Sequence, residues 1–394
     1  KVFINNVEVT STTSTINSTT VYTVTNSDFT NTDNENNFGS GRLIRFVQGL
    51  GADNQEMNGY TINKTDFTAD HDLKGVAYVH LHMIYDQEKL SGVPSVAFEI
   101  KGKKVFDPRD DSTAWTTNPA LIVRDMLTDT RYGLRATTDE VNDNSSVFGN
   151  FETAADDCEV QVNDKDGNAH NKYQANGFFN ASTSINEALQ GVLSSCAGKV
   201  TYVNGVFNIL VGKTQSPDVT ITDDDLINEV ELTSSTELAN IYNTVKPIYI
   251  DSETDYTSKD SAIRKEGEND SGTTTNFLTQ DTPSGATEAN FQRIMEMKLP
   301  FVTNDSQAQR LGKIALNYQR RTKIITVNTT LKFLQLAVGD WVYVTNSRLS
   351  FSSKKFEVLS ATTASTTDDN PIIYCQLTLK EVDNHIFDFD TASD

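Results

Sequence analysis

The sequence predicts a mainly β protein of the α+β class, with two β-barrel domains, helices that cover the barrel openings, and a small inserted α/β unit. Strand-like alternation of apolar and polar residues, as in GVAYVHLHMIYD at 75–86, recurs up to residue 110 and again after residue 320. Three short segments show the spacing of amphipathic helices. Hydrophobic residues make up only 37% of the chain, which favours β-domains with long polar loops over one large core.

The chain is too long for a single compact core, because a domain typically has ~100–200 residues. We predict a first β-barrel domain over 1–150 that includes a helix at 118–130. A small α/β unit of the hairpin–helix–hairpin type is predicted over 151–215. The second β-barrel domain is predicted over 216–394, with a helix at 305–321.

The first predicted helix has clear local signals. Asn118 is a good N-cap, and Pro119 suits the first helical position, where its missing N–H costs nothing. The spacing of the apolar residues leaves Arg124 for solvent, and Gly133 closes the following turn. A short helix with one apolar stripe is not stable alone, so we expect it to cover the first barrel. A polar loop is expected to follow, up to residue 155.

The α/β unit is predicted from turn and cap residues. An Asp166-Gly167 turn indicates a first hairpin. Ser184 begins a capping box and is followed by apolar residues at helical spacing. A second hairpin is predicted around a two-residue Asn204-Gly205 turn, because both residues tolerate the positive φ that such turns need.

The second β-domain is expected to begin with strands and a mobile polar excursion at 251–290, which is poor in apolar residues. The helix at 305–321 has an apolar stripe and a basic face, and strands such as DWVYVTN and PIIYCQLTLKEV follow it. Two interpretations of the basic face remain: a solvated surface, or a surface for an acidic partner such as a second copy of the chain. That face consists of Arg310, Lys313, Arg320 and Arg321.

Charge and cysteine content exclude some functions. With 54 acidic and 33 basic residues the net charge is −21, so capture of duplex nucleic acid by this surface is not expected. The acidic excess suits a solubilising surface, or a wall past which DNA slides.

The three cysteines, Cys158, Cys196 and Cys375, form neither a metal pattern nor a disulfide framework and are expected to be buried. The chain begins with Lys1 and is expected to be a processed product or a piece of a longer polypeptide.

Candidate metal sites are weak. His80 and His82 share a strand face, and His71 lies nearby in the sequence, but a zinc site needs further ligands that face them. A pair of histidines on a strand face is the alternative interpretation. Asp164 and the Asp166-Gly167 pair resemble the start of a calcium loop, yet the closing glutamate is missing, which favours a hairpin turn.

Catalytic motifs are also weak. Cys158 and His170 could be a nucleophile and its base, but no signature surrounds them, and two hairpin strands explain both. The sequence contains no Walker loop, His-Glu-x-x-His or Gly-x-Ser-x-Gly motif. We therefore predict no enzymatic activity, no cofactor and no metal.

One set of residues resembles a known family. A Lys-Gly-x-x-Val-Phe-Asp-Pro strand leads into a tryptophan, an Asn-Pro helix and an Arg-Tyr-Gly corner. The residues are Lys101, Gly102, Val105, Phe106, Asp107, Pro108, Trp115, Asn118, Pro119, Arg131, Tyr132 and Gly133. The later order, with an Asn204-Gly205 hairpin and Gly339-Asp340 before the last strands, is also similar. Residues 70–345 resemble the central tail-tip, or host-specificity hub, proteins of lambda-like long-tailed bacteriophages.

The resemblance implies a structural role in the virion. Hubs of this family form trimers at the distal end of the tail of a siphovirus, and each subunit supplies two barrels similar to a tail-tube subunit. The hub closes or narrows the tube and opens for DNA ejection into the host. The implied partners are further copies in a homotrimer, the distal tail protein, other tail-tip or baseplate proteins, and the tape-measure protein. A host surface receptor would bind through parts absent here, and DNA would contact the hub only in transit. The resemblance implies assembly in the bacterial host cytoplasm and a final location at the tail tip.

A receptor- or glycan-binding adhesin of the tail tip is the alternative function. Thr- and Asn-rich β-domains would serve an adhesin equally well. Clusters of exposed aromatic side chains on loop tips would favour the adhesin.

Overall fold

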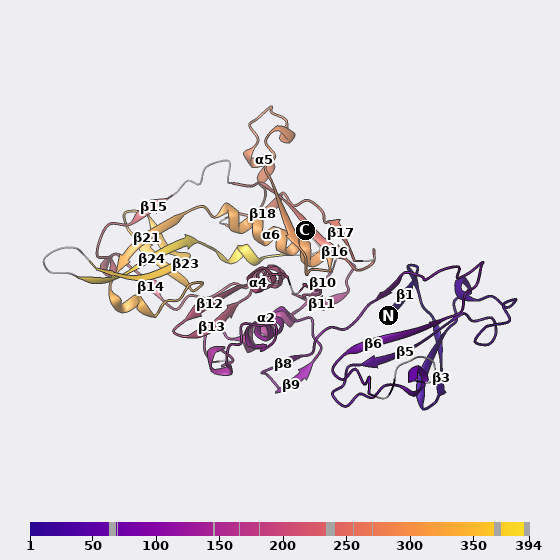
Figure 1. The fold of residues 1–394 in the computed structure, drawn as a ribbon. Coiled ribbons are helices and arrows are strands. Elements are labelled where there is room, and N and C mark those ends of the chain that lie inside the picture. The colour runs from indigo at the N-terminus through magenta and orange to yellow at the C-terminus, as the bar shows by residue number, and fades with distance from the viewer. Residues whose placement is uncertain are drawn as a thin grey trace. The chain divides into compact units, whose positions relative to one another are not determined.

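The computed structural model consists of two compact units, Lys1–Gly102 and Lys103–Asp394 (Figure 1). It describes residues 1–62, 68, 70–144, 146–164, 166–180, 182–233, 241–254, 256–269, 271–365 and 372–389. Strands outnumber helices among these residues, which confirms the mainly β class. The boundary between the units falls after Gly102, whereas the sequence places the first domain boundary after residue 150.

The first unit contains two antiparallel sheets around a small core. Its sheet orders are β2-β1-β7 and β3-β4-β5-β6. A two-residue turn at Asn17-Ser18, both with positive φ, joins β3 to β4. Leu43, Ile44 and Phe46 are buried in the core. The elements are β1 Val2–Ile4, β2 Val7–Glu8, β3 Ser11–Ile16, β4 Thr19–Val24, η1 Ser27–Phe29, β5 Ile44–Leu50, α1 Gly59–Ile62, β6 Ala77–Met83 and β7 Val96–Phe98.

The first half of the second unit combines helices with short hairpins. It contains β8 Val105–Asp107, β9 Ser112–Ala114, α2 Pro119–Thr128, η2 Thr138–Glu140, α3 Phe151–Glu159, β10 Gln161–Asn163, β11 Ala169–Asn171, α4 Ile185–Ser194, β12 Lys199–Val203 and β13 Val206–Leu210. The predicted Asn118 cap is confirmed, because its side chain accepts a hydrogen bond from Ala120 N. Both predicted hairpins are confirmed, and Gly167 and Gly205 have positive φ.

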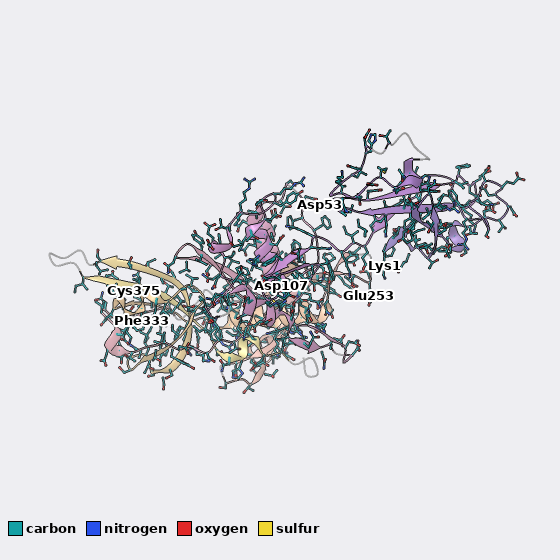
Figure 2. All side chains as sticks on the ribbon, turned by 90° about the horizontal axis from the view of Figure 1, so that it is seen from below. Lys1, Asp53, Asp107, Glu253, Phe333 and Cys375 are labelled. Atoms are coloured by element: carbon teal, nitrogen blue, oxygen red, sulfur yellow. The ribbon has the colours of Figure 1, made fainter. Side chains whose placement is uncertain are left out.

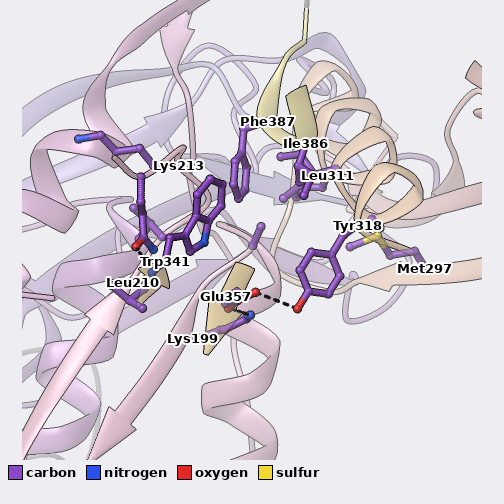
Figure 3. A pocket seen from close by; sticks show the side chains of 15 residues that line it. Lys199, Leu210, Lys213, Met297, Leu311, Tyr318, Trp341, Glu357, Ile386 and Phe387 are labelled. Atoms are coloured by element: carbon purple, nitrogen blue, oxygen red, sulfur yellow. Dashed lines mark hydrogen bonds and ion pairs between the residues drawn. The ribbon is translucent and has the colours of Figure 1, made fainter. Parts of the chain in front are cut away.

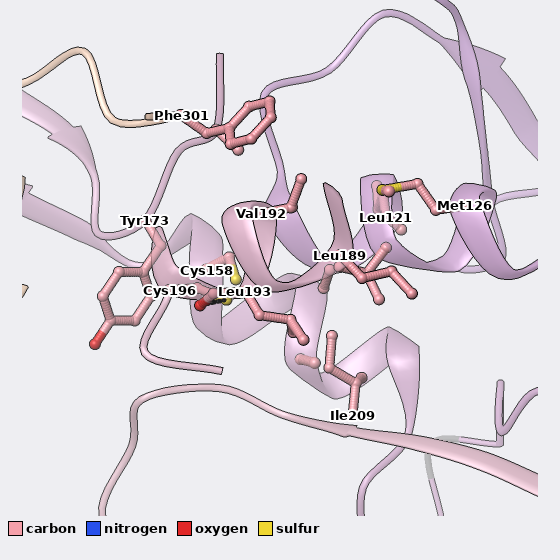
Figure 4. Packing of buried hydrophobic residues seen from close by; sticks show 14 of the residues in the cluster. Leu121, Met126, Cys158, Tyr173, Leu189, Val192, Leu193, Cys196, Ile209 and Phe301 are labelled. Atoms are coloured by element: carbon pink, nitrogen blue, oxygen red, sulfur yellow. Dashed lines mark hydrogen bonds between the residues drawn. The ribbon is translucent and has the colours of Figure 1, made fainter. Parts of the chain in front are cut away.

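The largest core of the protein lies between α2, α3, α4 and the β12-β13 hairpin. Figure 4 shows Cys158, Leu189 and Val192 of this cluster packed together. Helix α2 packs here, in the second unit, whereas the sequence predicted that it would cover the barrel of the first domain. Arg124 of α2 was assigned to solvent, but it is only 4% exposed. It pairs with Asp143 at 2.5 Å, which compensates the burial of its charge.

Helix α3 is absent from the sequence prediction, which has a polar loop up to residue 155. Asn150 caps the helix by accepting a hydrogen bond from Thr153 N. Phe151, Ala154, Ala155 and Cys158 follow at helical spacing and are buried. Cys158 therefore lies on a helix and not on a hairpin strand, whereas all three cysteines are free and buried as predicted.

Among the described residues, the second half of the second unit has a six-stranded, a three-stranded and a two-stranded sheet and one long helix. It contains β14 Thr220–Ile221, η3 Asp223–Asp225, β15 Glu231–Thr233, β16 Thr244–Asp251, β17 Thr257–Asp260, β18 Glu266–Glu268, β19 Thr274–Asn276, α5 Phe277–Asp281, η5 Glu288–Asn290, β20 Ile294–Leu299, α6 Asp305–Arg320, β21 Ile324–Thr329, η6 Leu331–Gln335, β22 Trp341–Asn346, β23 Phe351–Ser365, β24 Ile373–Glu381 and η7 Asn384–Phe387. The described part of the excursion at 251–290 forms strands β17, β18 and β19 and helix α5, so it is more ordered than predicted.

The six-stranded sheet has the order β14-β22-β23-β24-β21-β15 and encloses its own core. Phe333 from η6 and Cys375 from β24 are completely buried in it (Figure 2). A second sheet of order β17-β16-β20 packs against α6. Alternate residues of β16 are buried, as expected for a strand with one covered face.

A segment at 382–389, called the C-terminal strap below, binds across α6. Ile386 is completely buried in a cluster with Ile314 of α6 and Trp341 of β22. Asp383 pairs with Arg321. The strap thus joins the long helix to the six-stranded sheet. In the described part of the chain, no helix is long and apolar enough to span a membrane.

Candidate functional site

The family-like motif forms a polar junction between the β8-β9 hairpin and helices α2 and α3. The Asn118 side chain donates hydrogen bonds to Ala155 O and to the Glu159 carboxylate, both at 2.9 Å. The Arg109 guanidinium binds Glu159 at 2.8 Å and Asp107 at 2.7 Å. These partners raise the pKa of Arg109, with Asp107 the largest cause. Burial opposes ionisation of Glu159, yet hydrogen bonds from Arg109 and Asn118 bring its pKa below the usual value.

The Arg131-Tyr132-Gly133 corner is fixed by Asp129 at the end of α2. Asp129 accepts hydrogen bonds from the backbone N–H groups of Arg131 and Tyr132 at 2.8 and 2.6 Å. Lys103 donates to the same carboxylate at 2.5 Å. This Lys103 hydrogen bond, followed by the backbone N–H of Tyr132, lowers the pKa of Asp129 to about 2. A Cβ on Gly133 would lie 2.5 Å from Met126 O, so no larger residue fits without movement.

The remaining motif residues are distributed along the chain. Lys101 and Gly102 stand at the end of the first unit, Pro108 follows β8, and Trp115 is 39% exposed. Pro119 is buried at the first position of α2. Asn204 and Gly205 form the tip of the β12-β13 hairpin. A Cβ on Gly339 would lie 2.3 Å from Leu210 of that hairpin. Burial raises the pKa of the neighbouring Asp340.

The predicted basic face of α6 is buried, which corrects both interpretations of it as a solvent-facing surface. Arg310, Lys313 and Arg321 are each 2% exposed. Arg310 donates to Lys172 O at 2.9 Å, and Lys313 pairs with Glu268 at 3.0 Å. Arg320 pairs with Asp281 at 2.9 Å. The reason is that β16, β18 and the C-terminal strap cover α6 on several sides, so its cations meet partners from the same chain.

An apolar cavity of about 200 Å³ lies where α6, the β12-β13 hairpin, β22 and the strap meet (Figure 3). The Glu357 carboxylate on its wall accepts a hydrogen bond from Tyr318 Oη at 2.9 Å and pairs with Lys199. Lys380 lies opposite Glu357 on the neighbouring strand. Burial lowers the pKa of Lys380 to about 8, while Glu357 acts in the opposite direction. Because these polar groups bind one another, they favour a structural role for this wall of the cavity.

A second cavity, of about 400 Å³, is called the acidic cavity below. It lies between the β10-β11 turn, the end of β16 and the start of α6. Five carboxylates and two cations line it, an excess of three negative charges. These residues are Asp164, Asp166, Asp251, Glu253, Asp305, Lys259 and Arg264. Asp251 is buried and pairs with Lys259 at 2.7 Å, whereas Asp166 and Glu253 are exposed.

Comparison with known proteins points to phage tails. Residues 184–359 match a family model described as "Putative phage tail protein". A curated relative, the baseplate hub protein pb3 of Escherichia phage T5, is 21% identical over 286 residues, 69% of this chain. The findings support a phage tail protein.

The chain matches only part of a longer relative, and it shares its fold with a solved structure. The chain spans 28% of the length of the phage T5 protein. A chain of the virion of a native gene transfer agent particle has a TM-score of 0.53 and 14% identity, with 87% of this chain and 72% of that chain covered. This likeness shows the fold alone. A tail protein from Neisseria meningitidis has a TM-score of 0.37 and 14% identity, and covers 53% of this chain and 59% of its own.

The candidate catalytic and metal residues have structural partners. His80 Nδ1 lies 2.8 Å from Thr61 Oγ1, and the rings of His80 and His82 are 4.2 Å apart. His71 lies beside Thr68. Among the described residues, no group of three or more His, Cys, Asp or Glu side chains could hold a metal ion.

The candidate nucleophile, Cys158, is unsuited to attack. Cys158 is completely buried, and this burial, followed by Cys196, raises the pKa of its thiol well above its ordinary range. A protonated buried thiol is a poor nucleophile. His170 belongs to β11, and Asp164 accepts hydrogen bonds from its own turn.

Sequence reasoning missed Arg109, Glu159 and Glu357, which join segments distant in the chain. Arg109 follows the Asp107-Pro108 pair directly, so a cation beside a motif carboxylate was the available signal. No local signal marks Glu357, whose partner Lys199 is 158 residues away.

Proposed function

We propose that the chain is a subunit of the hub that adapts and closes the distal end of a phage tail tube. The observation that carries the proposal is the relationship to a baseplate hub protein over 69% of the chain. The match of residues 184–359 to a phage tail family supports it. In this proposal the hub is lambda-like, sits at the tail tip of a siphovirus, and opens for DNA ejection into the host.

The proposed assembly is a homotrimer. Two tube-like β-domains per chain favour three copies, because three times two matches a six-fold tube, and closed rings are usual for identical head-to-tail subunits. The partners would be the distal tail protein, other tail-tip proteins and the tape-measure protein, with host specificity residing in further parts. An acidic lumen wall, consistent with the net charge of −21, would not retain DNA in transit.

Imaging of the particle tests the proposal directly. We expect single-particle averages of the tail end to show this chain as a three-fold ring in line with the tube. An antibody fragment against the exposed β12-β13 tip at Gly205 would mark its position. Label along the tail shaft or on the capsid, or a six-fold ring of this chain, would contradict the proposal.

Two adjacent aromatic side chains favour the adhesin alternative. Phe178 is 85% exposed and Phe179 is 43% exposed, in the loop before α4. Exposed aromatic residues on a loop are common anchors in binding surfaces.

For a hub, we expect particles that carry Phe178→Ala and Phe179→Ala to adsorb to host cells at the wild-type rate, because receptor contact would lie elsewhere. The adsorption rate constant is the measurement. Phe148→Ala, which truncates another phenylalanine that is 54% exposed, is the matched control. A fall of about tenfold or more in the double variant alone, the size typical of a lost hot spot, would support the adhesin instead.

A further inference from the structure

The corner at 131–135 presents an exposed group of contact-forming side chains. Tyr132 is 62% exposed and Leu134 is 45% exposed. Arg131 and Arg135 are also exposed, and the Arg131 guanidinium lies 5.0 Å from the centre of the Tyr132 ring. Tyrosine and arginine are among the residues most enriched at the energetic centres of protein interfaces. The corner thus has the composition of an interface anchor.

The corner is also rigid. Leu134 N donates to Met126 O at 3.0 Å, and Ala136 N donates to Leu127 O at 2.9 Å. Together with the Asp129 contacts and the tight packing of Gly133, these bonds fix the backbone that carries Arg131 and Tyr132. A preorganised surface loses less entropy when it binds. The rigidity of the corner therefore favours a role in binding over that of a solvated loop.

Charge identifies the kind of surface that the corner would meet. Among the described residues, neither Arg131 nor Arg135 forms an ion pair with a carboxylate of its own chain. The acidic cavity carries an excess of three negative charges, and Asp166 and Glu253 are exposed beside it. Complementary charges orient such contacts and raise the association rate. Because the chain has a net charge of −21, a second copy supplies an acidic partner surface.

We propose that the corner at 131–135 of one copy docks into the acidic cavity of the next copy. This inference rests on the proposed ring-forming function. The corner and the cavity are different surfaces, so the contact is head-to-tail and repeats from copy to copy around a closed ring. Tyr132 enters the cavity, and Arg131 and Arg135 pair with carboxylates at its rim.

A charge-swap experiment tests the contact. Two variants of the full chain are made, Arg131→Glu/Arg135→Glu and Asp166→Lys/Glu253→Lys, and association is measured by sedimentation across the micromolar range. We expect the wild type to associate in a salt-sensitive way. Each variant alone should associate at least about tenfold more weakly. An equimolar mixture of the two should regain part of the association, because two of the three contacts in a mixed three-fold ring are complementary, one native and one reversed. Lys332→Glu/Arg348→Glu, in η6 and in the turn between β22 and β23, is the control with the same charge change as the arginine variant and should associate as the wild type does.

Three other outcomes would overturn the docking proposal. A wild-type chain that stays monomeric contradicts the choice of a second copy as occupant. Weakening without recovery in the mixture places the partner of the corner elsewhere. Thermal unfolding followed by circular dichroism is the folding control, and we expect all variants to melt as the wild type does, so that a loss of association is not a loss of folding. A three-fold ring in particles that is insensitive to these variants would leave the proposed function intact and reject only this contact.

Discussion

Replacing Lys313 by methionine is expected to lower the free energy of unfolding of the second unit by about 3–5 kcal/mol. Lys313 is 2% exposed, and its ammonium pairs with the Glu268 carboxylate at 3.0 Å. Methionine fills a similar volume but leaves Glu268, itself only 7% exposed, as a buried carboxylate without this cation. The loss is therefore dominated by desolvation of the remaining charge and not by a cavity. Urea unfolding followed by tryptophan fluorescence measures it.

Two variants separate this explanation from a general loss of charge. Arg348 pairs with Glu229, and both side chains are more than 70% exposed. Arg348→Met should change stability by no more than about 0.5 kcal/mol, because exposed pairs contribute little. Lys313→Met/Glu268→Gln should recover more than half of the loss, since no uncompensated charge remains. Equal effects of Lys313→Met and Arg348→Met would show that α6 is solvated after all.

Gly191→Ala is expected to destabilise the protein by about 1–3 kcal/mol, although alanine is the better helix former. Gly191 lies inside α4, and a Cβ there would stand 2.6 Å from the ring of Phe301. Gly177 contacts the same ring from another segment, with a Cβ distance that would also be 2.6 Å. The ring is held between two glycine backbones and cannot move away freely. Thermal unfolding measures the effect.

The sign of this effect should reverse when the ring is removed. Phe301→Ala alone should cost about 3–5 kcal/mol, because it leaves a cavity in the largest core. In that background Gly191→Ala should be stabilising, by up to about 1 kcal/mol from helix propensity. A loss of the same size in both backgrounds would mean that contact with Phe301 is not the cause.

Local signals predicted the elements that local chemistry forms. Asn118 before Pro119 caps α2, and Asn204-Gly205 turns the hairpin, because each depends on residues within four positions. The capping of α4 by Ser184 follows the same rule. Helix α3 has an equivalent cap at Asn150, but it was not predicted because its several acidic residues are also typical of a polar loop.

The environment of α6 and the candidate site could not be predicted in this way. A helix with four cations on one face is normally solvated on that face. Here partners such as Glu268 and Asp383 come from strands and a strap far along the chain, and only the tertiary fold brings them to α6. The junction around Arg109 likewise depends on Glu159, which is 50 residues away. Long-range pairing of charges leaves no periodic trace in a sequence.

The C-terminal strap has a consequence for how the protein is made. The core of the first unit uses residues up to Leu90 only, so its packing can be complete while the ribosome is still translating the second unit. In the second unit, Ile386 packs in one cluster with Ile314 and Trp341, so this cluster is incomplete until Ile386 has left the ribosome. Until then that apolar surface of α6 stays open to water and to chaperones, and the ion pair between Arg321 and Asp383 of the strap is not yet formed. Folding of the two units is thus separated in time by the order of synthesis.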